Sequence, residues 1–154
     1  MSNTVGILLV DTGSQQGSTL FENGLPVASM LERAGYLVAG METVAADQQS
    51  LETKLKEWAD RLDLIVTMGG VSLKPEDVVP EATEAVCQRM IPGMGEAMRL
   101  RCYDITPRAV LSRGTAGIRG RTVILNLPGK AQSAKENLEP VLPTLSHALD
   151  MLRM

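Results

Sequence analysis

Two short apolar runs constrain the fold of this chain more than any other feature of its sequence. Residues Val5–Val10 (VGILLV) and Leu64–Thr67 (LIVT) lack the alternation of hydrophobic and polar residues that marks a half-exposed strand. Continuous apolar runs of this length are typical of strands that are buried on both faces. A further strand is predicted at Tyr36–Thr43. The pattern therefore indicates a sheet that is covered on both sides.

Amphipathic segments lie between the apolar runs and predict helices. Leu51, Leu55, Trp58 and Leu62 recur at spacings of four, three and four residues, which places them on one face of a helix. Asp47 is suited to cap the start of that helix. An earlier helix is predicted to end at Ala34, with Pro26 in its first turn and Gly35 just after its end. Later helices are predicted from Pro80 to Met90, after Gly93, and from about Ser133. Strands are predicted at Ala109–Leu111 and Thr122–Leu127, with a turn at Arg119–Arg121.

The order of these elements predicts the fold class. Strands and helices alternate over most of the 154 residues, which is typical of an α/β fold. We expect three layers (αβα), with a mostly parallel sheet in the middle and helices on both of its faces. No repeat or change of composition divides the chain, so residues 1–154 are predicted to form one domain. In such folds the binding site lies at the carboxyl ends of the strands.

Charge and composition argue against several classes of function. The net charge is −3 and no stretch is strongly basic, which argues against general binding to nucleic acid or to anionic membranes. Aromatic residues make up 3% of the chain, too few for a surface on which bases stack. No apolar segment reaches membrane-spanning length, and the first residues lack a basic leader region. Cys87 and Cys102 form no metal-binding pattern, so we expect a cytoplasmic protein with two reduced thiols.

Residues capable of chemistry follow the predicted strands. They are Asp11 after the first strand, Asp47 after the second, Gly69, Gly70, Val71, Ser72 and Asp77 after the third, Ser112 and Arg113 after the fourth, and Asn126, Pro128, Gly129 and Lys130 after or at the end of the last. Glycines let backbone N–H groups approach a phosphate closely, and carboxylates bind Mg²⁺ together with phosphate oxygens. A rim of this composition suits a small polyanion bound with a divalent metal.

Each of these features also has a purely structural explanation. The Gly69-Gly70 pair can form a tight turn, and Asp47 can be a simple helix cap. Asp77 can be an exposed acid in a turn, and Arg113 can be a solvated charge rather than a partner of phosphate. The chain contains neither GxxxxGK[ST] nor GxGxxG, so a P-loop and a dinucleotide site are disfavoured. On residue patterns alone these alternatives stay open.

Several motifs, in order along the chain, resemble those of molybdopterin adenylyltransferases and related molybdopterin-binding proteins (the MoaB/Mog family). Gly69–Thr83 (GGVSLKPEDVVPEAT) resembles GGTGxxxRDxTPEAT, and Pro92–Arg99 (PGMGEAMR) resembles PGxGExMR. Leu111–Arg119 resembles LSRxxxGxR, and Asn126–Gly129, followed by Ser133, resembles NLPGxPxS. The resemblance covers nearly the whole chain, and the motifs are far more specific together than singly.

The resemblance implies an activity and its partners. Members of the family transfer AMP from ATP to the terminal phosphate of molybdopterin, require Mg²⁺ and release pyrophosphate. The adenylylated product accepts molybdate or tungstate in a later step, so a molybdenum insertase is an implied downstream partner. Family members are usually homotrimers and some are hexamers, which implies an oligomer here.

The resemblance also implies roles for individual residues. Asp47 and Asp77 match the family's two functional acids, which implies that they hold Mg²⁺ and orient the phosphates. Asp11 matches the acid of a family Ser-Asp motif. The residues implied to bind substrate or to line the pterin or nucleotide pocket are Gly69, Gly70, Val71, Ser72, Ser112, Asn126, Pro128 and Gly129. A surface acid contributes little to folding, so replacing Asp77 with alanine is expected to abolish transfer with little loss of stability.

Departures from the family pattern leave three interpretations. Val71-Ser72 replaces Thr-Gly, as in insertase relatives and competence-damage-type proteins of the same superfamily, and Glu76 replaces an arginine near the phosphates. Val10 replaces the serine before Asp11, and the second proline of NLPGxPxS is absent. The chain is therefore expected to be an adenylyltransferase, or a molybdopterin-binding protein without transfer activity, or a more distant nucleotide phosphohydrolase of the competence-damage type.

Overall fold

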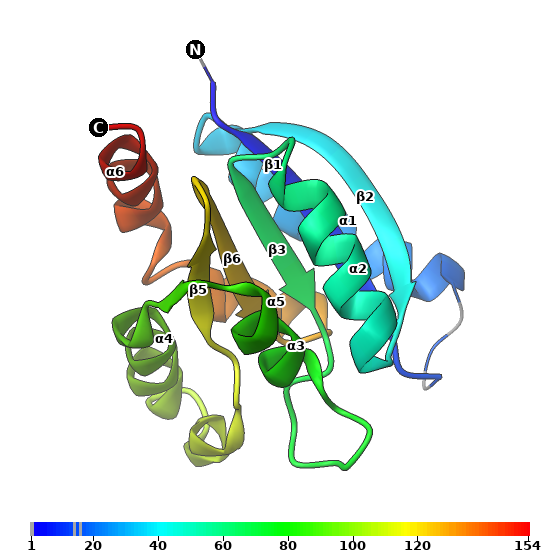
Figure 1. Cartoon of the computed structure of the whole chain (residues 1–154). Helices are drawn as coiled ribbons and strands as arrows, with labels where there is room; N and C mark the ends of the chain where they lie inside the picture. Colours follow the sequence, from blue (N-terminus) through cyan, green and yellow to red (C-terminus); the bar gives the residue numbers. More distant parts are fainter. Residues whose placement is uncertain (1, 14, 16) are drawn as a thin grey trace.

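A mixed sheet of six strands with helices on both sides forms the centre of the protein, in a computed structural model that describes residues 2–13, 15 and 17–154 (Figure 1). The strands are β1 (Thr4–Asp11), β2 (Leu37–Ala45), β3 (Leu64–Met68), β4 (Arg89–Met90), β5 (Ala116–Arg119) and β6 (Thr122–Leu127). Their order across the sheet is β2-β1-β3-β6-β5-β4. The first four strands of this order are parallel, whereas β6, β5 and β4 pair antiparallel. The predicted α/β fold is confirmed, and its antiparallel pairs lie at one edge.

Helices connect the strands and cover the two faces of the sheet. They are α1 (Gly17–Arg33), α2 (Gln48–Ala59), α3 (Val79–Val86), α4 (Pro92–Tyr103), the 3₁₀-helix η1 (Pro107–Leu111), α5 (Ala131–Leu138) and α6 (Leu142–Leu152). In Figure 1, α2 and α3 lie on the near side of the sheet, and α5 lies behind it. No helix in the described part of the chain is long and apolar enough to cross a membrane.

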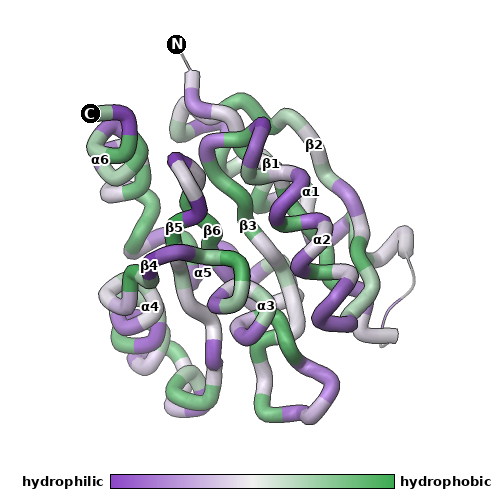
Figure 2. Tube along the Cα trace, in the orientation of Figure 1, coloured by the Kyte–Doolittle hydropathy of each residue, from purple (hydrophilic) through white to green (hydrophobic). Residues whose placement is uncertain are grey.

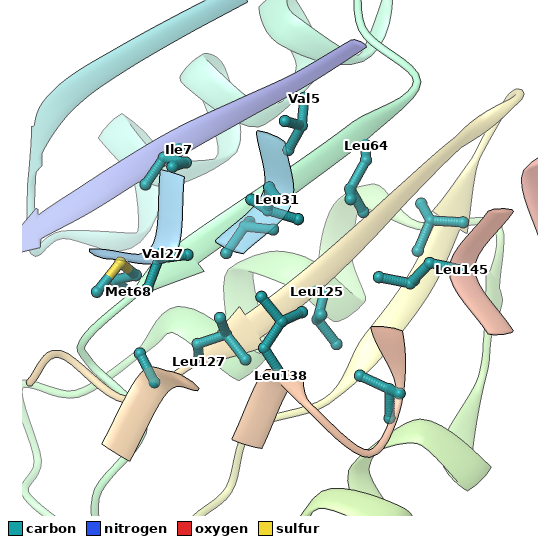
Figure 3. Packing of buried hydrophobic residues seen from close by; sticks show 14 of the residues in the cluster. Val5, Ile7, Val27, Leu31, Leu64, Met68, Leu125, Leu127, Leu138 and Leu145 are labelled. Carbon is teal, nitrogen blue, oxygen red and sulfur yellow. The ribbon is translucent and has the colours of Figure 1, made fainter. Parts of the chain in front are cut away.

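Each face of the sheet carries its own hydrophobic core, because successive side chains of a strand point to opposite faces. Ile7 and Leu9 of β1 belong to the core packed against α1, α4, α5 and α6, part of which is drawn in Figure 3. Leu8 and Val10 belong to the core packed against α2 and α3. All of β3 is buried, which explains its continuous apolar sequence. Figure 2 shows the corresponding hydrophobic stretches within the sheet and hydrophilic ones along the outer helices.

Two predicted helix ends are confirmed. Asp47 precedes α2 in an extended conformation, and its carboxylate accepts a hydrogen bond of 2.9 Å from the Ser50 backbone N–H. Gly35 follows α1 with φ of +96°, a conformation that glycine adopts without strain. Tyr36 N donates to the Leu31 carbonyl at 3.0 Å, which completes a Schellman motif at the end of α1.

The first part of the chain differs from the prediction in two helices. Because α1 begins at Gly17, Pro26 lies in the middle of the helix rather than in its first turn, where it removes one helical hydrogen bond. The helix predicted to reach Met90 ends at Val86 instead. The next residues join the edge of the sheet as β4, since Gln88 N donates to the Ile118 carbonyl at 2.8 Å.

The second half of the chain differs in two further places. The strand predicted at Ala109–Leu111 is the 3₁₀-helix η1, which Pro107 opens, and the strand lies later, at Ala116–Arg119. The predicted turn at Arg119–Arg121 is confirmed, with Gly120 at φ of +60° between β5 and β6. The single last helix is divided into α5 and α6, and Pro140 lies in the break between them.

Candidate functional site

The carboxyl ends of β1, β3 and β6 meet in the middle of the sheet and open into a cavity of about 520 Å³. The chain runs outward from β1 to β2 in one direction and from β3 to β6 in the other, which places the cavity at a topological switch point. Its lining residues are Val10, Thr12, Gly13, Gln15, Leu20, Gly69, Gly70, Val71, Ser72, Lys74, Glu76, Asp77, Pro128, Gly129 and Lys130. The volume falls within the range of small-molecule sites.

Glycines form one wall of this cavity from main-chain atoms. Gly69 and Gly70 have φ angles of +106° and +72°, and Gly69 N donates to the Leu127 carbonyl at 2.9 Å. A Cβ atom at Gly129 would lie 3.4 Å from the Gly69 Cα, and one at Gly70 would lie 2.5 Å from Cγ2 of Val79. A side chain at Gly70 therefore does not fit without displacement, and Gly69, Gly70 and Gly129 line the cavity with main-chain atoms alone, which an anion can approach closely.

Asp77 closes the loop that follows this wall. The residue is 7% exposed, and its Oδ2 accepts hydrogen bonds from the Ser72 backbone N–H (3.0 Å) and from the Ser72 hydroxyl. Its own backbone N–H donates to the Lys74 carbonyl at 3.0 Å. The structure thus corrects the expectation of a surface acid with little influence on folding. Asp77 is a buried group that both shapes the loop and lines the cavity.

The guanidinium group of Arg113 donates hydrogen bonds to other residues of the protein. Nε donates to the Ser72 carbonyl at 2.8 Å, and one terminal nitrogen donates to the Asp77 carbonyl. Both terminal nitrogens also contact the Glu81 carboxylate, at 2.6 and 3.2 Å. The hydrogen bond to Glu81 raises the Arg113 pKa and lowers the Glu81 pKa. Arg113 does not line the cavity, so the structure does not place it against a bound phosphate.

Asn126 lies in the core rather than in the cavity wall. It is 1% exposed, and its Nδ2 donates to the hydroxyl oxygens of Thr67 and Thr83, both at 3.0 Å. Its Oδ1 accepts from the Thr115 backbone N–H at 3.2 Å. Asn126 therefore joins β3, β6 and α3 beneath the loops of the site. It was predicted from the sequence to line a pocket instead.

Ser112 lies beside the cavity, in a second hollow of about 630 Å³. This groove is lined by Val71, Ser72, Leu73, Lys74, Arg108, Leu111, Ser112 and Pro128. Four of these residues (Val71, Ser72, Lys74 and Pro128) also line the first cavity, so the two hollows adjoin. The Ser112 hydroxyl accepts a hydrogen bond of 3.3 Å from the Gly114 N–H.

Two of the predicted acids, Asp47 and Asp11, are not among the residues that line the cavity with Asp77. Asp47 is exposed and lines a separate hollow over α2, and hydrogen bonds from Ser50 lower its pKa. Asp11 is exposed and accepts a hydrogen bond of 2.9 Å from the Gly13 N–H. The structure does not bring Asp47 and Asp77 into one cavity, and within the described residues no group of three or more His, Cys, Asp or Glu could hold a metal. The predicted role of Asp47 with Mg²⁺ stays a prediction.

Three charged residues outside the predicted set of binding residues line the cavity in the described part of the chain, and Lys74 is the one that the sequence did not place at the strand ends. Lys74 comes from the loop after β3, and Lys130 comes from the start of α5. Glu76 lines the same space, so the departure from the family's arginine faces the site. Lys74 and Glu76 lie within the Gly69–Thr83 motif, and Lys130 directly follows NLPG, so their places in the motifs were the available signals. Two ammonium groups and a main-chain wall can neutralise a polyanion.

Comparison with known proteins places this geometry in a family. Residues 6–147 match the family described as a probable molybdopterin binding domain. The chain belongs to this family. The match confirms the family that the sequence motifs predicted.

Curated relatives and solved structures agree with the family match. The chain is 44% identical over 113 residues to the molybdopterin adenylyltransferase of Helicobacter pylori, which covers 72% of this chain and 64% of the relative. The chain thus spans less than two thirds of that relative. It is 37% identical over 145 residues to the molybdopterin adenylyltransferase of Escherichia coli K12, covering 90% of this chain and 74% of the relative. The structure of the molybdopterin biosynthesis enzyme MoaB from Thermus thermophilus superposes with a TM-score of 0.87 at 44% identity, covering 97% of this chain and 96% of that one.

Proposed function

We propose that this protein is a molybdopterin adenylyltransferase, which transfers AMP from ATP to the terminal phosphate of molybdopterin. The observation that carries the proposal is the cavity at the carboxyl ends of β1, β3 and β6, with its Gly69-Gly70 wall, its two lysines and Asp77. Identity of 37% to 44% with relatives named molybdopterin adenylyltransferase supports the same activity.

The reaction is a substitution at phosphorus between two anions. A terminal phosphate oxygen of molybdopterin forms a bond to the α-phosphorus of ATP, the bond from that phosphorus to the oxygen bridging to the β-phosphate breaks, and pyrophosphate leaves. No side chain needs to form a covalent bond. The protein's contribution is to hold both reactants in place and to neutralise their charge. The main chain at Gly70, together with Lys74 and Lys130, would do this, since the Gly69 N–H already donates to the Leu127 carbonyl.

Mg²⁺ is compatible with the donors in this cavity. Proteins bind Mg²⁺ through one or two carboxylates together with substrate phosphates, so a cluster of three acids is not required. Both hydrogen bonds that Asp77 accepts from Ser72 end on Oδ2, and Glu76 supplies a second carboxylate in the same lining. Asp77 and Glu76 would hold the ion, which would supply positive charge to the phosphates.

A second candidate is a molybdopterin-binding protein of the same fold that does not transfer AMP. The observation that favours it is the position of Glu76, whose negative charge faces the cavity in place of the family's arginine. The implied trimer or hexamer, the insertase as downstream partner and the cytoplasmic location are further expectations of the family resemblance.

The test is release of pyrophosphate by the purified protein given molybdopterin, ATP and Mg²⁺. Asp77→Asn is the informative variant, because it keeps the side-chain size and one acceptor for Ser72 while removing the negative charge. Asp104→Asn, an exposed acid at the end of α4, is the matched control. We expect release by the wild type and by the Asp104 variant, and loss of release in the Asp77 variant.

The other outcomes separate the alternatives. Binding of molybdopterin in a parallel titration without release of pyrophosphate would refute the enzyme and support the binding protein. Release of phosphate or pyrophosphate from nucleotide in the absence of molybdopterin would instead support a phosphohydrolase of the competence-damage type.

A further inference from the structure

The guanidinium group of Arg113 reaches across the base of the loop formed by residues 71–77, hereafter the 71–77 loop. An arginine carries five N–H donors, and those of Arg113 engage three partners: the Ser72 carbonyl, the Asp77 carbonyl and the Glu81 carboxylate. The arginine backbone N–H adds a hydrogen bond of 2.8 Å to the Val71 carbonyl.

These contacts join the two ends of the loop. Val71 and Ser72 follow the Gly69-Gly70 wall, whereas Asp77 directly precedes Val78, the N-cap residue of α3. One side chain therefore contacts both the start and the end of the loop, whose base is also closed by a hydrogen bond of 3.3 Å from the Val79 N–H to the Gly70 carbonyl. Within the loop itself, the hydrogen bonds from Ser72 to the Asp77 carboxylate depend on the distance between these two ends.

Glu81 holds the guanidinium group in this orientation. Its carboxylate accepts hydrogen bonds from both terminal nitrogens, and the Arg113 side chain is 33% exposed. The positive charge of Arg113 is thus already paired with the Glu81 carboxylate. A phosphate would have to displace Glu81 or the carbonyl groups to bind the guanidinium group.

We propose that Arg113 is a positioning residue, which holds the 71–77 loop so that Ser72 and Asp77 stay in the cavity wall. The inference deepens the proposed function and rests on it for its effect on catalysis. The planar fork of arginine is essential to this role, because several acceptors in different directions must be met at once. Lysine keeps the charge but has no such fork.

The test compares Arg113→Lys and Arg113→Met with the wild type. The matched control is Arg61→Lys, which changes an exposed arginine paired with Glu57 on α2. Hydrogen–deuterium exchange is followed in peptides from the 71–77 loop and from β3. The kcat for pyrophosphate release is corrected for the fraction of each variant that is folded in the assay buffer, as obtained from its urea titration. We expect loop amides to exchange about tenfold faster in both Arg113 variants, with β3 amides unchanged. We expect kcat to fall about 100-fold in both, and neither quantity to change in the control.

Three results would overturn the inference. Loop exchange at the wild-type rate in Arg113→Met would show that the loop does not depend on this side chain. Wild-type kcat and loop protection in Arg113→Lys would show that a point charge suffices. Equal loss of protection in the loop and in β3 would indicate a general loss of stability. If the wild type itself releases no pyrophosphate, the proposed function fails, and the exchange data alone decide whether Arg113 orders the loop.

Discussion

Replacing Gly70 with alanine should destabilise the protein through two separable effects. The first is backbone strain, because Gly70 has φ of +72°, a conformation that costs an L-residue about 1–2 kcal/mol. The second is a clash, because the new Cβ would lie 2.5 Å from Cγ2 of Val79, which is fully buried. Overpacking of this kind costs about 1–3 kcal/mol. We therefore expect the free energy of unfolding to fall by about 2–5 kcal/mol.

Gly35→Ala is the matched control for the first effect. Gly35 has φ of +96°, and a Cβ there would meet nothing within 4 Å, so it carries the backbone strain without the clash. Its expected loss is about 1–2 kcal/mol. The clash can also be relieved by Val79→Ala, which alone should cost about 2 kcal/mol for two buried carbon atoms. The double variant, with alanine at both Gly70 and Val79, should then lose about 1–3 kcal/mol less unfolding free energy than the two single losses added together.

Urea unfolding monitored by tryptophan fluorescence measures these differences. The chain has one tryptophan, Trp58, which is 2% exposed in the core beneath α2 and reports loss of that core. Equal losses for Gly70→Ala and Gly35→Ala would refute the role of the clash. Strict additivity of the Gly70 and Val79 changes would refute it independently.

Four other experiments each probe a small set of contacts. Asn126→Ala should lower the free energy of unfolding by about 3–5 kcal/mol in urea titrations, because it removes three hydrogen bonds, two of them buried, and leaves a cavity. Asp47→Ala should lower the melting temperature near neutral pH. Because hydrogen bonds from Ser50 lower the Asp47 pKa from 3.8, the carboxylate stabilises the fold above pH 3.8, and the difference in melting temperature from wild type should shrink as the pH falls through the lowered pKa. Cys87, whose pKa burial raises to about 11 from 9.0, should react with iodoacetamide at pH 8 about 100-fold more slowly than an exposed thiol. Lys74→Gln and Lys130→Gln should each weaken ATP binding about tenfold in calorimetric titrations at low salt. An unchanged affinity would show that the replaced lysine does not contact ATP.

The fold was predictable where local chemistry and packing agree. The uninterrupted apolar runs of β1 and β3 predicted strands buried on both faces, and the cap at Asp47 and the glycine at Gly35 predicted helix ends correctly. The errors arose where distant contacts decide. Arg89 and Met90 are good helix formers by propensity, yet they become a strand because β5 pairs with them.

The site was predictable as a set of loops but not as a set of contacts. The rule that ligands bind at strand ends selected the Gly69–Ser72, Asp77 and Pro128–Gly129 segments, all of which line the cavity. The sequence could not show that Asn126 points into the core or that Arg113 is paired with Glu81. Side-chain direction at those positions depends on α3 and on residues that are tens of positions away.

The glycine wall of the cavity separates two kinds of recognition. Peptide groups at Gly69 and Gly129 keep their dipoles in place as long as the backbone follows the same path, whatever side chains surround them. The charges of Lys74, Glu76 and Lys130, by contrast, can each be altered by a single substitution. Variation in this protein can therefore change the charge of the cavity lining one residue at a time, while the geometry of the glycine wall is inherited with the fold.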